Sequence, residues 1–237
     1  MYADVARKLE LLEEKIDAAC RRSGRKREEI KLMGVTKSHP LEAVKAAWDA
    51  GIRLFGESRV QEGREKFAQF RETCNWKEGA ELHLIGSLQR NKAKTAAAFF
   101  DCIQSLDRDS LISELGALCA GRGKPLAVLL EYHTGEETKA GFPDQESLFK
   151  AAEKVLSFSG LKPMGLMTMA PFTTDTGVIR ASFKKLNRAR DELEKRFPAG
   201  NNSGSNWACL SMGMTNDFEI AIEEGSTIIR IGTAIFS

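Results

Sequence analysis

The amino-acid sequence predicts a (β/α)8 barrel, formed as a single domain by residues 1–237. The length of 237 residues is close to the roughly 250 residues that are typical of this fold. Eight short apolar runs alternate with helical patterns, an order that favours a parallel sheet. In addition, Val5, Leu9, Leu12 and Ile16 recur at helical spacing, which predicts an opening helix with one apolar face.

The predicted strands are apolar runs bounded by Gly, Pro, Ser or Asp, and each is too short for a typical helix. An open doubly wound sheet is the alternative. It is less well supported because no dinucleotide fingerprint or phosphate loop follows the first run. The eight predicted strands are residues 31–36, 52–55, 81–85, 100–104, 126–132, 163–167, 207–210 and 227–231.

Helical patterns lie between these strands, but the sequence stops at Ser237, directly after the eighth. We therefore expect no helix after that strand, and we expect the opening helix, residues 2–23, to take the vacant outer position beside it. A Gly- and Ser-rich stretch at 199–205 predicts a loop. The helices predicted between strands are residues 41–49, 58–72, 89–98, 108–121, 144–158, 176–196 and 216–224.

Composition indicates an ordinary globular protein, with 42% apolar and 29% charged residues. A net charge of +2 gives no strong field toward nucleic acid or membrane. The basic run 21–27 is interpreted as a solvated helix end capped by Gly24. The five cysteines and three histidines are scattered, and their spacing matches no metal-binding motif. We therefore expect reduced thiols and no bound metal. Because neither a signal peptide nor a membrane-spanning run is present, the expected location is cytoplasmic.

The first predicted strand is followed directly by Lys37. Barrels build their sites at the carboxyl ends of the strands, so this amine is expected at the mouth of the core. Burial there would lower the pKa of the amine enough for attack on a carbonyl, whereas a solvated loop lysine is the alternative. The next strand ends carry Glu57, Ser58, Gly86, Ser87, Ser105, Tyr132, His133, Met167 and Thr168.

The loops after strands seven and eight predict a phosphate site. Ser211 and Gly213 precede a helix, and Gly232 and Thr233 follow the last strand; barrels often hold phosphate there. Arg230 lies between two isoleucines, where its charge requires a partner; a structural ion pair is the alternative to a ligand contact. An amine that forms an imine, a phosphate seat and an inward arginine together describe pyridoxal 5′-phosphate held as a Schiff base.

Six stretches cover nearly the whole chain in order. They are Gly34-Val-Thr-Lys37, Phe55-Gly-Glu-Ser-Arg-Val-Gln-Glu62, His83-Leu-Ile-Gly-Ser-Leu-Gln-Arg-Asn-Lys92, Gly165-Leu-Met-Thr-Met-Ala-Pro171, Leu210-Ser-Met-Gly-Met-Thr-Asn-Asp-Phe-Glu219 and Ala221-Ile-Glu-Glu-Gly-Ser-Thr-Ile-Ile-Arg-Ile-Gly-Thr-Ala-Ile-Phe236. These stretches resemble the pyridoxal phosphate homeostasis protein family, whose barrel is similar to the amino-terminal domain of alanine racemase. The last two are the most specific. The sequence departs from the family's pattern at Ser58, where Asn is usual, and at Ser237, where Gly is usual.

The resemblance implies a protein that buffers pyridoxal 5′-phosphate and delivers it to apo-enzymes. It implies that Lys37 carries the cofactor as a Schiff base and that Arg230 faces the pyridine nitrogen. Neither a nucleic-acid nor a membrane partner is expected, and a monomer is expected because the pattern shows no obvious apolar outer patch. The remaining cofactor-binding residues that the resemblance implies are Met167, Ser211, Gly213, Gly232 and Thr233.

A carrier without turnover is the preferred interpretation. Arginine only donates hydrogen bonds, so Arg230 beside the ring nitrogen keeps that nitrogen unprotonated and weakens the ring as an electron sink. Alanine racemase adds a tyrosine base from a further domain, and here Tyr132 is the only plausible substitute. A racemase-like amino-acid enzyme using Lys37 and Tyr132 is one alternative, and a sugar-phosphate binder without an imine is another. His83 is interpreted as a hydrogen-bonded strand histidine.

Overall fold

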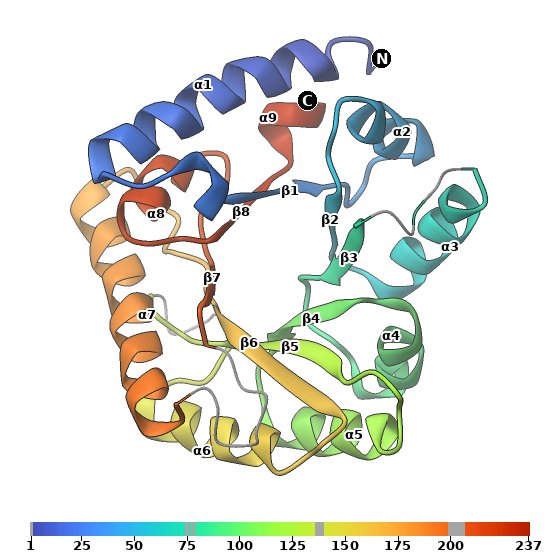
Figure 1. Ribbon diagram of the computed structural model, residues 1–237, viewed down its shortest axis with the longest axis vertical. Coiled ribbons are helices and arrows are strands. Elements are labelled where there is room, and N and C mark those ends of the chain that lie inside the picture. Colours follow the sequence, from blue (N-terminus) through green and yellow to red (C-terminus); the bar gives the residue numbers. More distant parts are fainter. Residues whose placement is uncertain (1, 74–75, 77–78, 136–139, 199–206) are drawn as a thin grey trace.

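The computed structural model of the protein describes residues 2–73, 76, 79–135, 140–198 and 207–237. Within them, eight parallel strands follow one another from β1 to β8 around a closed barrel, and β8 pairs back with β1. Helices surround the barrel on the outside (Figure 1). The predicted (β/α)8 architecture is therefore confirmed. The loop predicted at 199–205 lies outside the described residues.

All eight predicted strands are present, but three begin two residues later than expected. Ile52, Phe100 and Trp207 were assigned to strands because they are apolar, and they are indeed buried. The amides of Ile52 and Phe100, however, bond to Ala47 and Ala96 in the preceding helices instead of a neighbouring strand. The strands are β1 (Lys31–Val35), β2 (Leu54–Glu57), β3 (Glu81–Leu84), β4 (Cys102–Leu106), β5 (Leu126–Glu131), β6 (Leu161–Met167), β7 (Cys209–Ser211) and β8 (Ile228–Ile231).

The helices between strands lie where the periodic patterns predict them. One expectation is wrong: a short helix, α9, follows β8 directly, because the last residues make one helical turn from Gly232. The α-helices are α1 (Val5–Ser23), α2 (Leu41–Asp49), α3 (Val60–Arg71), α4 (Ala93–Phe99), α5 (Asp109–Cys119), α6 (Gln145–Leu156), α7 (Thr176–Arg196), α8 (Phe218–Glu223) and α9 (Thr233–Phe236); the 3-10 turns are η1 (Arg27–Glu29) and η2 (Arg90–Lys92).

The opening helix α1 occupies the outer position that the sequence predicts for it. It packs against α8, α9 and α2, and in Figure 1 it lies outside β1 and β8. Its apolar stripe, which includes Leu9, Leu12 and Ile16, is buried. Gly24 ends the helix with a left-handed φ of 67°, and its N–H donates to the Arg21 carbonyl. The interpretation of the basic run as a capped helix end is thus confirmed.

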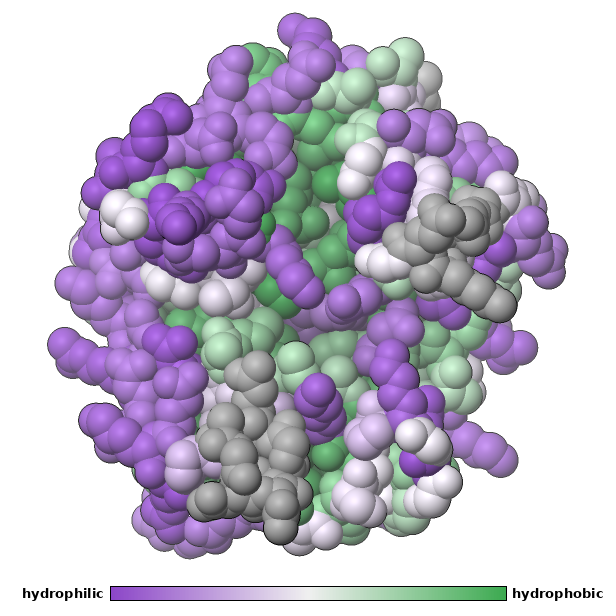
Figure 2. Space-filling model, viewed as in Figure 1, coloured by the Kyte–Doolittle hydropathy of each residue, from purple (hydrophilic) through white to green (hydrophobic). Residues whose placement is uncertain are grey.

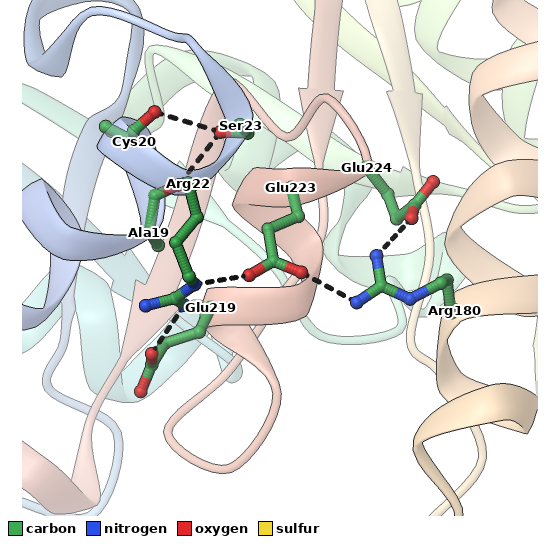
Figure 3. A network of polar contacts seen from close by, with 8 residues as sticks. All are labelled: Ala19, Cys20, Arg22, Ser23, Arg180, Glu219, Glu223 and Glu224. Carbon is green, nitrogen blue, oxygen red and sulfur yellow. Dashed lines mark hydrogen bonds and ion pairs between the residues drawn. The ribbon is translucent and has the colours of Figure 1, made fainter.

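A network of charged side chains fastens α1 to α8 and α8 to α7 (Figure 3). Arg22 of α1 donates to Glu223 and Glu219 of α8, both at 2.8 Å. From the other side, Arg180 of α7 donates to Glu223 at 2.6 Å and also pairs with Glu224. The network therefore holds α8 from two neighbours, and α8 is the helix that follows the β7 loop.

The barrel has two apolar regions, one between the strands and the helices and one inside the strand ring. Met33, Val35, Leu54 and Ile228 pack together inside the ring. Figure 2 shows hydrophilic residues over the rim of the molecule and hydrophobic residues gathered toward the middle of the face. None of the helices in the described part of the chain has the length and apolar character that crossing a bilayer requires.

Candidate functional site

A cavity of about 560 Å³ lies at the carboxyl ends of the strands. Its volume is within the range of small-molecule sites, and its position is the one that barrel enzymes and binders use. Most of its walls come from residues that end β1, β5 and β6 and from the loops after β3, β6, β7 and β8. Five of the seven residues predicted to bind a cofactor line it, namely Lys37, Met167, Arg230, Gly232 and Thr233.

Lys37 continues the inward-facing row of β1. Side chains alternate along a strand, and Met33 and Val35 both face the barrel interior, so Lys37 belongs to the same row and lines the cavity. The expectation that its side chain is buried is wrong, because Lys37 is exposed. Lys37 is therefore an accessible amine at the cavity wall, and the backbone on either side of it is held in place by neighbouring residues.

That backbone is held on both sides by α3. The Lys66 ammonium donates to the Thr36 carbonyl at 2.7 Å, and the Glu62 carboxylate accepts the Ser38 N–H at 2.8 Å. Ser38 has a φ of 63°, a left-handed conformation that costs energy in a residue other than glycine. We call Thr36, Ser38, Glu62 and Lys66 the clamp; it fixes the position from which the Lys37 side chain starts.

A buried ion pair supports the clamp. Glu57 at the end of β2 is fully buried, and its Oε1 accepts from Lys66 at 2.8 Å and from the Thr36 hydroxyl at 2.7 Å. Burial raises the pKa of Glu57, and the bonds from Lys66 and Thr36 oppose that rise. Its Oε2 has no hydrogen-bond partner among the described residues. The pair thus ties β1, β2 and α3 together beneath the clamp.

Arg230 is buried on the inner face of β8, at the edge of the same cavity. Its guanidinium donates to the Ser211 hydroxyl at 2.9 Å and to the Thr168 carbonyl at 2.8 Å. Burial lowers the pKa of Arg230 to about 10, so the side chain remains charged at neutral pH. Across the described part of the chain no carboxylate pairs with it, which contradicts the structural ion pair considered from sequence.

Ser211, which was expected to be a phosphate ligand, is not among the residues that line the cavity. It is fully buried on β7, and its hydroxyl donates to Oε1 of Gln104 at 2.6 Å while accepting from Arg230. The expectation rested on its position at a strand end. The structure shows that Ser211 belongs to the inward row of β7, beneath the cavity floor.

Gly213 is likewise absent from the cavity wall among the described residues, and it serves packing instead. It has a φ of 95°, and a Cβ there would lie 2.6 Å from the Ala221 Cβ of α8. The residues of this loop that do line the cavity are Met214, Thr215, Asn216 and Asp217. Thr215 and Asn216 were not among the predicted site residues; their place shortly after the Gly213 turn, in the loop before the helix, was the available signal.

The β7 and β8 loops meet at the predicted phosphate seat. The Ala234 N–H donates to the Thr215 hydroxyl at 3.4 Å, so the two loops are in contact. A Cβ at Gly232 would lie 3.2 Å from the Val35 carbonyl, which makes a small residue favourable there. Together with Thr233, these residues give one end of the cavity a cluster of hydroxyls and backbone amides suited to an anion.

Glu131 is a cavity residue that the sequence interpretation missed. It is buried at the end of β5, and burial, followed by the charge of Asp107, raises the pKa of Glu131 to about 7, while Arg230 opposes the rise. The strand was predicted to run on to Tyr132, so Glu131 was placed inside it. An acidic residue at the end of an otherwise apolar run was the signal.

Tyr132 lies outside the cavity wall described here. Its ring is buried, and the Lys185 ammonium lies 5.0 Å from the ring centroid. Tyr132 is therefore a buried aromatic residue directly after β5, and it is not among the residues that line the cavity, where a second base would have to lie. Ser58, in contrast, does line the cavity. His83 is hydrogen-bonded within β3 and to Gln104, as the sequence interpretation expected.

Comparison with protein families matches residues 8–237 to the alanine racemase amino-terminal domain. The pyridoxal phosphate homeostasis protein of Aquifex aeolicus is 38% identical over 224 residues, which cover 94% of this chain and 93% of that protein. The protein of the same name from Vibrio cholerae is 36% identical and covers 98% of this chain and 95% of its own length.

Comparison with solved structures also finds similar proteins over nearly the whole chain. The crystal structure of an unknown protein from Bifidobacterium adolescentis has a TM-score of 0.90 and 34% identity, covering 98% of this chain and 94% of its own. PipY from Synechococcus elongatus, solved with PLP bound, has a TM-score of 0.82 and 30% identity and covers 98% of this chain and all of its own. Alanine racemase from Clostridium difficile, at 13% identity and a TM-score of 0.74, shares the fold over 99% of this chain and 56% of the racemase.

Proposed function

Because the chain belongs to the pyridoxal phosphate homeostasis protein family, we propose that it binds pyridoxal 5′-phosphate as a Schiff base on Lys37 and maintains the intracellular supply of this cofactor. The observation that carries the proposal is one cavity whose walls include the Lys37 amine, the Arg230 guanidinium and the Gly232–Thr233 loop. An amine and an anion seat in one cavity match the aldehyde and the phosphate of a single small molecule.

The residues fit the parts of the cofactor as follows. The amine of Lys37 would hold the aldehyde carbon as an imine, with water released on condensation. The hydroxyl of Thr215 and the amides of Gly232 and Thr233 hold the phosphate, and Met167 lines the cavity beside the ring. Arg230, fixed by Ser211 and Thr168, would be the donor to the ring nitrogen.

We propose that the protein is a carrier without turnover. Pyridoxal phosphate supplies an electron sink when its ring nitrogen is protonated, and an arginine donor leaves that nitrogen unprotonated. One of the ionisable residues that line the cavity, Glu131, has a pKa of about 7 and therefore has acid–base capacity near neutral pH. Glu131 is thus a candidate for the second base that a racemase-like activity would need beside Lys37. If the protein exchanged the α-proton of an amino acid with solvent deuterium, and Glu131→Gln lost this exchange, the protein would be an enzyme and the proposal of a carrier without turnover would be wrong.

Absorbance tests the imine. The protein loaded with pyridoxal phosphate should show a visible imine band that borohydride removes, with the reduced cofactor found on the peptide that contains Lys37. Lys37→Ala should lose both the band and the label. Lys45→Ala, an exposed lysine of α2, is the matched control and should keep both. A band of wild-type strength in Lys37→Ala would refute the assignment, and binding of phosphate compounds without any imine would favour the sugar-phosphate alternative.

We further propose that a single domain spanning residues 1–237 performs this function as a monomer in the cytoplasm. The cysteines that the structure describes are free thiols, which suits a reducing compartment. The proposed partners are apo-enzymes that require pyridoxal phosphate, with no part for nucleic acid or membrane. Loaded protein should activate such an apo-enzyme, whereas borohydride-reduced protein should not; light scattering tests the monomer.

A further inference from the structure

A chain of hydrogen bonds crosses the barrel interior from the cofactor cavity to the opposite opening. Arg230 donates to Ser211, and Ser211 donates to Oε1 of Gln104 at 2.6 Å. Nε2 of Gln104 lies 2.8 Å from Nδ1 of His83, and Nε2 of His83 lies 2.8 Å from the Glu81 carboxylate. Four of these five residues are buried, and they come from β8, β7, β4 and β3.

The direction of every bond follows from the first donor. A guanidinium only donates, so Ser211 accepts from Arg230 and has its own O–H for Gln104. The carbonyl oxygen of Gln104 takes that proton, which leaves the amide NH2 pointing at His83. Nδ1 of His83 must then be the unprotonated nitrogen, and its Nε2–H points at the Glu81 carboxylate. Each member donates away from the cofactor cavity and toward Glu81.

The far end of the chain reaches water. Glu81 is half-exposed and, with His83, lines a second cavity of about 340 Å³ at the amino-terminal end of the barrel. The hydrogen bond from His83 is the main reason that the pKa of Glu81 falls to about 2. A permanent carboxylate thus lies at one end of the chain and a permanent guanidinium at the other.

We propose that His83 and Gln104 are positioning residues for Arg230, so that the amino-terminal end of the barrel sets the geometry of the cofactor cavity. The inference rests on the proposed function, in which Arg230 faces the cofactor ring. The amide of Gln104 accepts a hydrogen bond through its oxygen and donates one through its nitrogen, but it does not pass a proton from one atom to the other. The chain therefore orients groups and does not conduct protons. If Nδ1 of His83 lost its acceptor role, Gln104 would have to rotate, and Ser211 would lose the acceptor for its O–H.

Two substitutions of His83 separate positioning from packing. In His83→Asn the side-chain oxygen takes the place of Nδ1 and still accepts from Gln104. In His83→Gln the amide takes the place of Nε2, keeps the bond to Glu81 and leaves Gln104 without its acceptor. The measurement is the ¹⁵N–¹H spectrum of the arginine guanidinium groups in cofactor-free protein, with the Arg230 signals assigned from Arg230→Lys.

His83→Gln should shift the Arg230 signals and weaken pyridoxal phosphate binding about fivefold, the ratio that corresponds to one hydrogen bond of about 1 kcal/mol. His83→Asn should leave the Arg230 signals near wild type and change binding less than about twofold. Equal effects of the two variants, or unchanged Arg230 signals in His83→Gln, would overturn the inference. If His83→Gln does not fold, Gln104→Met, which keeps the volume and removes both bonds, must shift the same signals. Failure of the wild type to bind the cofactor would count against the proposed function alone, since the spectra need no cofactor.

Discussion

Glu131 provides a test of the cavity's electrostatics that does not depend on any ligand. Its pKa is raised from 4.5 to about 7, chiefly by burial. The folded protein therefore keeps this carboxyl protonated at pH values where the unfolded chain has already released the proton. Stability from this group is fully present below pH 4.5 and is lost as the pH rises through 7. Replacing Glu131 with glutamine, which cannot ionise, removes that loss.

The size of the effect follows from the two pKa values. Each unit of difference corresponds to about 1.36 kcal/mol, so the group costs the folded state about 3 kcal/mol well above pH 7. Between pH 5 and pH 8 the change is about 2.5 kcal/mol, because part of the loss already occurs below pH 5. Glu131→Gln should therefore gain about 2.5 kcal/mol of stability relative to wild type on going from pH 5 to pH 8.

Urea unfolding of cofactor-free protein at the two pH values measures this difference. Other titrating groups cancel because wild type and variant are compared at each pH. Glu10→Gln, which replaces an exposed glutamate of α1, controls for the removal of a surface carboxylate. A stability difference between Glu131→Gln and wild type that stays constant from pH 5 to pH 8 would show that the Glu131 carboxyl is not held neutral.

Three further substitutions test the packing around the site, each by urea unfolding. Lys66→Met should cost about 3–5 kcal/mol because it leaves Glu57 charged and buried without its partner, and adding Glu57→Gln should recover much of the loss. No recovery would mean that Lys66 matters only for the Thr36 carbonyl. Gly165→Ala should cost more than about 3 kcal/mol, since its Cβ would lie 1.9 Å from the Cys209 carbonyl at a φ of 149°; a loss under about 1 kcal/mol would contradict that geometry. Arg180→Ala should cost less than about 1 kcal/mol and less still in high salt, and a larger, salt-independent loss would contradict a surface network.

The order and type of the elements could be predicted because barrel strands and helices have strong local patterns. The ends of the strands could not, as β2 illustrates. Ile52 is apolar and was included, while Glu57 is charged and was excluded, yet Glu57 pairs in the ladder and Ile52 does not. What makes Glu57 compatible with burial is Lys66, which arrives from the next helix, so the deciding contact is not local.

The candidate site was also predictable only where local sequence position decides where a residue lies. Lys37, Arg230, Gly232 and Thr233 were found because a strand end or a loop position is enough to place them. Ser211 occupies a comparable strand end but binds Gln104 of β4, a contact that sequence spacing does not reveal. The exposure of Lys37 could not be predicted from the sequence either, because it depends on how far the surrounding loops rise above the strand.

The clamp around Lys37 has a consequence for how a ligand is received. Two side chains of α3 already hold the segment on either side of the lysine in a conformation that a free chain would rarely adopt. The conformational entropy of that segment is therefore lost during folding. A ligand that binds to Lys37 then loses less binding free energy, because the backbone around the lysine is already ordered. Only the flexible arm of the lysine remains to be ordered, which suits the proposed role of the protein as a carrier.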